Sequence, residues 1–153
     1  MSIPIAGPGN GLVFATVSYR MVSTNAVSYG DAVPVDTASV NATTGFFDTM
    51  DSTASASSTG ADEEWAMIGL CMESGGISAG GEGLFMFRGM FSRAVTSDTV
   101  TTGDPMAYDD ASDDLTIGLG TGDKIIAFAM TDNSGTEVDV LFDGLNGFGS
   151  RQG

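Results

Sequence analysis

The chain has 153 residues, of which 20 are acidic and five are basic, so its formal net charge is −15. Such a surface repels nucleic acid and disfavours anionic membranes, because both partners attract Lys and Arg. The absence of histidine removes the usual general base at neutral pH and the commonest metal ligand. This length is typical of one domain with a hydrophobic core. The single cysteine, Cys71, excludes an intrachain disulfide and is expected to be a small buried side chain.

The first residues differ in composition from the rest of the chain. Residues 1–11 contain two prolines, three glycines and two isoleucines, a composition that cannot form a helix. We expect an extended arm, with a disordered segment as the alternative. The segment has neither a positive n-region nor an apolar run long enough for a signal peptide or a membrane span. Residues 12–153 are expected to form a single β-domain.

The following segments have the patterns of short strands. Residues 12–22 alternate in polarity, which predicts a half-buried β-strand. The apolar residues 32–35 and the Gly-Phe-Phe sequence at 45–47 predict two further short strands. Residues 48–64 are rich in Ser, Thr, Ala and Asp and predict a long polar loop.

One stretch of the chain occurs twice. Residues 103–112 (GDPMAYDDAS) repeat the pattern of residues 30–39 (GDAVPVDTAS): a Gly-Asp turn, a short apolar run, an aspartate and a closing Ala-Ser. The turn, the strand and the close recur, whereas most of the clustered acids in the second copy have no counterpart. We therefore interpret the stretch as a structural turn that starts each half of a duplicated β-domain.

Two further pairs of segments extend the duplication. Residues 65–73 match residues 124–131, with large side chains in one phase and small ones in the other. Small side chains let another backbone approach closely, so both strands are expected to be buried on two faces. Residues 84–91 match residues 139–146. The corresponding apolar positions of this last pair are Phe85, Phe87, Val140 and Phe142.

These patterns together predict the fold class. Glycine-rich turns join the paired strands, as in hairpins, and no segment has a convincing helical periodicity. With 22 glycines and many short strands, the chain is expected to be all-β: a single domain of β-barrel, β-tulip-like or β-sandwich type, built from two related halves. One barrel and two packed sheets remain open at this point.

A subunit contact is predicted on one strand. The side chains opposite Phe85 and Phe87 form an apolar face with an arginine at its rim, a combination typical of an interface. A second layer of core beneath the N-terminal strand is the alternative. The matching face of the second copy, with Asp139 and Asp143, is expected to face solvent. The interface candidates are Leu84, Met86, Arg88 and Met90.

No catalytic or cofactor motif stands out. The clustered carboxylates of Asp109, Asp110, Asp113 and Asp114 are of the kind that holds Ca²⁺, but the spacing lacks the central glycine and terminal glutamate of an EF-hand. A Ca²⁺-dependent extracellular β-module, of adhesion or surface-layer type, is therefore kept as an alternative. Other acidic residues are not placed across a cleft by their spacing, so a glycan-active enzyme is less favoured still. We expect no enzyme, no metal and no cofactor.

Three motifs carry a resemblance to a known family. Residues 103–109 (GDPMAYD) are similar to a Gly-Asp turn followed by Pro, an apolar residue, an aromatic residue and Asp. Residues 87–91 (FRGMF) precede that turn by a Ser/Thr/Val-containing linker, and residues 125–129 (IIAFA) are similar to an "IGVA" strand that leads to a last strand of alternating Val and Asp. Over residues 68–144 the chain thus resembles bacteriophage head-decoration proteins, which are also called capsid cement proteins.

The resemblance implies a partner and a location. Proteins of this kind are β-barrel or β-tulip-like domains that assemble as trimers on the outside of an expanded capsid, often with an N-terminal arm over the major capsid protein. We therefore expect a homotrimeric, non-enzymatic protein, made in the host cytoplasm, that stabilises the mature shell of the virion. The acidic character and the polar insertion at residues 48–64 depart from the shorter members. The candidates for capsid contact are Ile3, Ile5, Phe14 and Arg20.

Overall fold

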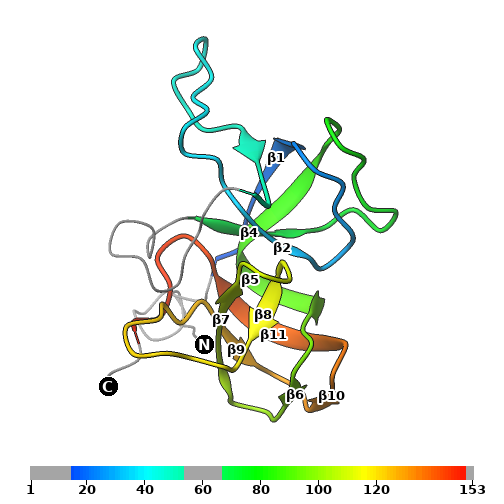
Figure 1. Cartoon of the computed structure of the whole chain (residues 1–153), viewed down its shortest axis with the longest axis vertical. Coiled ribbons are helices and arrows are strands. Elements are labelled where there is room, and N and C mark those ends of the chain that lie inside the picture. Colours follow the sequence, from blue (N-terminus) through cyan, green and yellow to red (C-terminus); the bar gives the residue numbers. More distant parts are fainter. Residues whose placement is uncertain (1–14, 54–66, 151–153) are drawn as a thin grey trace, which may run out of the picture.

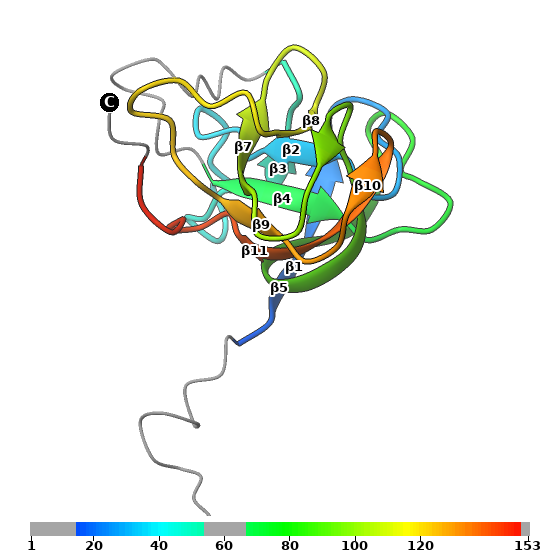
Figure 2. The same ribbon diagram turned by 90° about the horizontal axis from the view of Figure 1, so that it is seen from below.

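A computed structural model describes residues 15–53 and 67–150 of the chain. Across these two ranges the chain is all-β, as expected, and none of it forms a helix that could span a membrane. Nine strands make one sheet that curls into a nearly closed barrel, while β6 and β10 pair separately (Figures 1 and 2). The strands are β1 (Val17–Ser23), β2 (Ala32–Pro34), β3 (Thr49–Met50), β4 (Ile68–Cys71), β5 (Glu82–Val95), β6 (Thr99–Val100), β7 (Pro105–Asp109), β8 (Asp114–Thr116), β9 (Ala127–Ala129), β10 (Asn133–Ser134) and β11 (Glu137–Asp143).

The first half of the domain is a ring of five strands. β1 pairs with β5, β5 with β4, and β4 with β2. β3 completes the ring, because it pairs with β1 and is bridged through Met50 to Val35, just after β2. The ring encloses an apolar cluster of Met21, Val27, Val33, Val35, Met50, Cys71, Ile77, Phe85 and Phe87.

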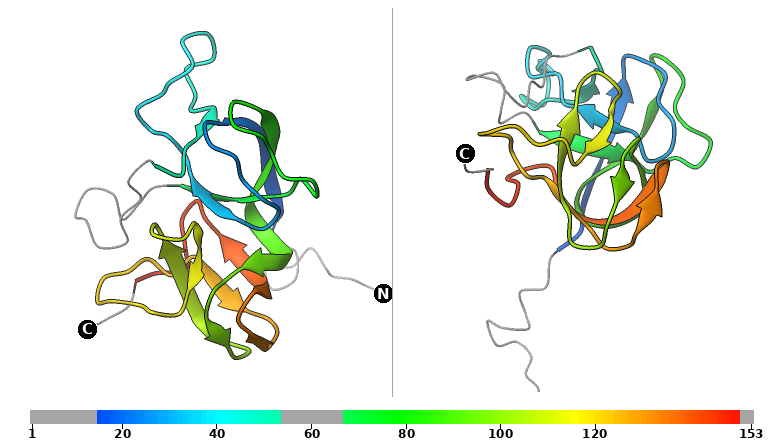
Figure 3. Two further views of the ribbon diagram at one scale, coloured as in Figure 1. Left: turned by 45° about the vertical axis from the view of Figure 1, so that its right-hand side comes forward. Right: turned by 60° about the horizontal axis from the view of Figure 1, so that its bottom comes forward.

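The second half repeats this order of strand pairing, although among the described residues β8 is not paired back to β5 as β3 is paired to β1. β5 continues beyond the first ring, and its second part pairs with β11. β11 then pairs with β9, β9 with β7, and β7 with β8 (Figure 3). The larger apolar cluster fills this half and extends to Ala32, Ile68 and Leu70 of the first half. The two halves therefore share both the long strand β5 and a continuous core.

Strand registers confirm the duplication pair by pair. Phe85 and Phe87 occupy the positions of Val140 and Phe142, as the sequence predicts. The Gly-Asp turns also form the same hydrogen bonds: the glycine N–H donates to a carbonyl at the end of the neighbouring strand, and the aspartate carboxylate accepts a backbone N–H three residues earlier. These bonds join Gly30 to Cys71 (2.9 Å) and Asp31 to Ser28 (2.6 Å) in the first copy, and Gly103 to Ala129 (2.8 Å) and Asp104 to Thr101 (2.9 Å) in the second.

The duplication extends further than the sequence comparison predicts. β1 corresponds to the second part of β5, because Tyr19 lies opposite Phe85 as Phe91 lies opposite Val140. β3 corresponds to β8, since Met50 faces Val35 as Leu115 faces Tyr108. Weak sequence similarity hides both relations, which only the hydrogen-bonded registers reveal.

One strand prediction is wrong. Residues 45–47 form no strand of their own, and the strand is β3, which starts at Thr49. The reason is local: Asn41 Oδ1 accepts the N–H groups of Thr43 (2.8 Å) and Thr44 (3.1 Å), which closes a turn instead of continuing an extended strand. The polar loop expected from residue 48 thus begins with a strand. Its part from 54 to 64, like the arm at 1–11, lies outside the described residues.

Candidate interaction site

Corresponding rows of side chains cross the sheet in the two halves. Each row runs over four strands through directly paired residues, so its members lie side by side on one face. We call the row in the first half the first row and its counterpart the second row. The first row is Ser18, Met86, Leu70 and Ala32; the second row is Met90, Leu141, Phe128 and Pro105.

The first row is covered by the second half of the same chain. Leu70 and Ala32 are fully buried and Met86 is 6% exposed. All three belong to the cluster that includes Phe91 and Phe142 of the second half. All four residues of β4 are buried, as predicted for a strand with neighbours on both faces.

The second row is not covered in this way. Met90 is 67% exposed, and Pro105, Phe128 and Leu141 are only partly buried. The prediction that β9 is buried on both faces is therefore wrong at Phe128, which is only partly buried and whose ring meets Phe148 edge-on at 5.1 Å. The sheet thus presents an apolar row whose equivalent elsewhere in the chain is core.

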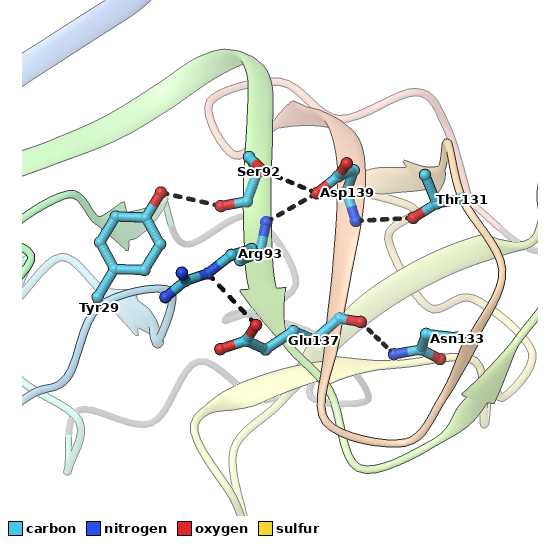
Figure 4. Close-up of polar contacts among 7 residues, drawn as sticks. All are labelled: Tyr29, Ser92, Arg93, Thr131, Asn133, Glu137 and Asp139. Carbon is cyan, nitrogen blue, oxygen red and sulfur yellow. Dashed lines mark hydrogen bonds and ion pairs between the residues drawn. The ribbon is translucent and has the colours of Figure 1, made fainter.

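Tyr29 of the first half contacts the second half. Its ring stacks on Phe91, with centroids 5.2 Å apart, and its hydroxyl donates to the carbonyl of Ser92 at 2.9 Å. The guanidinium of Arg93 lies 5.3 Å from the centre of the same ring. Figure 4 shows the hydroxyl of Tyr29 directed at the carbonyl of Ser92, with the side chain of Arg93 beside the Tyr29 ring.

A β-bulge shapes the strand that receives Tyr29. Ser92 and Arg93 together oppose Asp139, and Arg93 has a left-handed φ of 65°. The Asp139 carboxylate holds this conformation, because it accepts the Ser92 hydroxyl (2.9 Å) and the Arg93 N–H (3.0 Å) (Figure 4). An ion pair of 3.3 Å between Arg93 and Glu137 lies on the exposed side. The bulge turns the Ser92 carbonyl toward the first half.

The seam between β2 and β8 is closed by one backbone hydrogen bond. The Ala32 N–H donates to the Asp113 carbonyl at 3.0 Å, and the Tyr108 hydroxyl donates to the Asp113 carboxylate at 2.8 Å. Burial raises the pKa of Asp113, and the charges of Asp114 and Asp110 raise it further, although the bond from Tyr108 lowers it. Burial also raises the pKa of Asp31, which faces the charge of Asp113. Ionised carboxylates therefore oppose closure of this seam.

Replacing Asp113 by asparagine is expected to stabilise the protein at neutral pH. Asparagine keeps an acceptor for Tyr108 and tolerates the left-handed φ of 55° at this position. We expect a gain of about 0.5 kcal/mol, since solvent screens a half-exposed carboxylate. A raised carboxyl pKa means that the wild type gains stability as the pH falls from neutral toward the ordinary aspartate value of about 4. Urea unfolding should show that gain reduced in Asp113→Asn and reduced to a smaller extent in Asp110→Asn, which removes one of the charges that raise the pKa of Asp113. An undiminished gain in Asp113→Asn would contradict this role of Asp113.

A groove opens in the first half beside β1. It has a volume of about 470 Å³ and is walled on its outer side by Phe46, which is 75% exposed, and Phe47, which is 37% exposed. Arg20 stands at the rim in an exposed ion pair with Glu82 at 2.8 Å. The groove is lined by Tyr19, Arg20, Met21, Val35, Thr44, Phe46, Phe47, Met67, Phe87 and Leu145.

The structure divides the predicted subunit contacts. Met90 is exposed as expected, whereas Met86 is buried in the core, beneath the second half rather than beneath the N-terminal strand. Leu84 and Arg88 are half-buried, and Arg88 forms an ion pair of 3.0 Å with Asp143. Asp143 is 5% exposed, so the solvent-facing role expected for it is wrong. It is needed to pair with Arg88 between β5 and β11.

The predicted capsid contacts fall in different places. Arg20 lies at the rim of the groove, whereas Ile3, Ile5 and Phe14 lie outside the described residues. Sequence reasoning missed Tyr19, Phe46 and Phe128 as surface residues. Two adjacent phenylalanines beside a polar loop were the available signal for Phe46.

The acidic turn uses its carboxylates internally. Asp109 accepts the Ala111 N–H (3.0 Å) and the Ser112 hydroxyl (3.1 Å), and Asp114 accepts the Ser112 hydroxyl (2.7 Å). Within residues 15–53 and 67–150, no three acidic, Cys or His side chains are grouped as metal ligands. Cys71 is fully buried, and burial raises the pKa of its thiol, as for an unreactive core cysteine.

Comparison with known proteins does not extend these observations. No family model matches the chain, and none of the curated proteins compared with it is significantly similar. The second row, the groove and the sequence resemblance are therefore the features that bear on function.

Proposed function

We propose that the protein is a non-enzymatic decoration protein that binds the outer surface of a phage capsid as a homotrimer and stabilises the mature shell. The observation that carries this proposal is that the acidic protein leaves two apolar surfaces at least partly exposed, the second row and the groove. Soluble monomers rarely expose contiguous apolar areas without a binding role. A protein with two such surfaces can contact two neighbours, as a coat requires.

The sequence resemblance supports a capsid as the partner. In this proposal Ile3, Ile5 and Phe14 contact the major capsid protein together with Arg20, whose side chain is 60% exposed. A few hundred Å² of apolar contact contributes usefully at about 25 cal/mol per Å², before association costs are subtracted. Many copies on one shell, each binding only the mature lattice, then stabilise that lattice by mass action.

Co-sedimentation with empty expanded capsids of the parent virus tests the proposal. We expect the full chain to sediment with expanded shells to saturation and to protect them against heat. A variant that lacks residues 1–11 should bind at least about tenfold more weakly, because the apolar arm is lost. Absence of the full chain from the capsid pellet would contradict the proposal. Equal binding of the two proteins would remove the arm from it.

A further inference from the structure

We propose that copies of this chain assemble head to tail, with the second row of one copy seated in the groove of the next. This contact between two molecules is equivalent to the contact that joins the two halves within one molecule. This contact would form the interface of the homotrimer. That three copies assemble, and not another number, rests on the proposed function.

The groove is the first-half equivalent of a filled space in the second half. By strand register, Tyr19 corresponds to Phe91 and Phe87 to Phe142. In the second half these aromatic side chains are buried in the cluster that contains Leu70 of the first row. In the first half Tyr19 is 58% exposed and lines the open groove. The first row covers the aromatic side chains of the second half, but no equivalent row in the described part of the same chain covers Tyr19 at the groove.

The second row is the equivalent of the first row. It occupies the same four paired positions as the first row, with Phe128 at the place of Leu70 and Leu141 at the place of Met86. The residues that flank the second row are also more exposed than residues that flank the first row. Gly103 is exposed where Gly30 is buried, and Met130 is 45% exposed. One copy thus carries the uncovered groove and also the uncovered row that fits it.

The loop that bears Phe46 and Phe47 is the first-half counterpart of the turn that ends at Asp113. Because Thr49 corresponds to Asp114, this loop takes the place of the tight turn that ends at Asp113. In the chain that turn accepts the Ala32 N–H. Proline at 105 has no N–H and cannot repeat the bond. Apolar contact with the exposed phenylalanines replaces it between copies.

The charge distribution agrees with this contact. The second row has no charged side chain, and among the described residues that line the groove the one charged side chain, Arg20, already pairs with Glu82. The rest of a copy with a net charge of −15 repels its neighbours. Association should therefore strengthen as salt screens the repulsion.

The geometry makes the contact heterologous, because different surfaces of the two copies meet. Such contacts close into a ring when the rotation between copies fits, and otherwise continue as a filament. A closed ring of three would satisfy every row and every groove. This is the state expected for the proposed homotrimer.

Mixing two surface variants tests the pairing. Met90→Glu places a charge on the second row, and Phe46→Glu places one in the groove; both side chains are mostly exposed, so folding should be preserved. Each substitution is expected to weaken self-association about a hundredfold, because a charge is forced into an apolar contact. The mixture should form a one-to-one dimer by light scattering, since an intact row meets an intact groove once.

The outcomes are distinct. Val40→Glu, at an exposed position of the same loop that does not line the groove, is the matched control and should assemble like the wild type. A wild type that stays monomeric at high salt and high concentration would overturn the inference, and so would a mixture of the two variants that stays monomeric. Loss of capsid binding by an oligomeric wild type would instead count against the proposed function alone.

Discussion

Gly144→Ala is expected to destabilise the protein by at least about 4 kcal/mol, which places it among the most damaging single substitutions. A Cβ at this position would lie 1.9 Å from the carbonyl oxygen of Ile68 and 2.9 Å from its carbon. Both atoms are backbone and cannot move aside without opening the sheet. The Gly144 N–H donates to Phe87 (2.8 Å) and its carbonyl accepts from Ile68 (2.9 Å), so the residue joins β4, β5 and the end of β11.

Urea unfolding with a matched glycine checks this prediction. Gly75→Ala is the control, because nothing lies within 4 Å of a Cβ at that position. The control should unfold like the wild type, while Gly144→Ala should be unfolded or nearly so at room temperature. If Gly144→Ala keeps a stability within about 1 kcal/mol of the wild type, the close approach of the halves is not as described.

Asp143→Ala is expected to cost about 3–5 kcal/mol, the range for breaking one side of a buried ion pair. The Asp143 carboxylate is 7% exposed and lies 3.0 Å from the Arg88 guanidinium. It also accepts the N–H groups of Leu145 (3.1 Å) and Asn146 (3.0 Å). Removing it leaves a half-buried guanidinium and two N–H groups without this acceptor, at the end of β11 where that strand pairs with β5.

The exposed pair Arg20–Glu82 provides the comparison. Its side chains are 60% and 57% exposed, so Glu82→Ala should leave the unfolding midpoint unchanged. Thermal unfolding at low and high salt should separate the two pairs, because salt screens exposed charges and hardly affects buried ones. An equal effect of both substitutions would contradict the buried role of Asp143.

The repeated turn and the alternation of large and small residues predicted much of the fold. They gave the all-β class, the matched strands and the phase of Phe87 with Phe142, because local pattern and hydrogen-bonded register agree in both halves. They could not indicate which face is covered. Leu70 and Phe128 have the same pattern around them, yet Leu70 is fully buried and Phe128 only partly, since burial depends on the neighbouring half.

The site was predicted less well for a related reason. Met90 was correctly placed on the surface, whereas Met86, on the same strand face, lies beneath the second half. The bulge at Arg93 changes which residues face outward, and an arginine with a left-handed φ leaves no recognisable sequence signal. The local pattern predicts a strand at Phe46, because it does not reveal the turn that Asn41 closes through side-chain hydrogen bonds.

Disulfide trapping tests the central claim, head-to-tail repetition of the contact between halves, most directly. Within the chain Tyr29 stacks on Phe91 at 5.2 Å, and their counterparts are Thr102 and Tyr19. An oxidised mixture of Thr102→Cys and Tyr19→Cys should give a covalent dimer, whereas neither variant alone should, because Cys71 is fully buried. No dimer in the mixture, or equal dimer in each protein alone, would contradict the account.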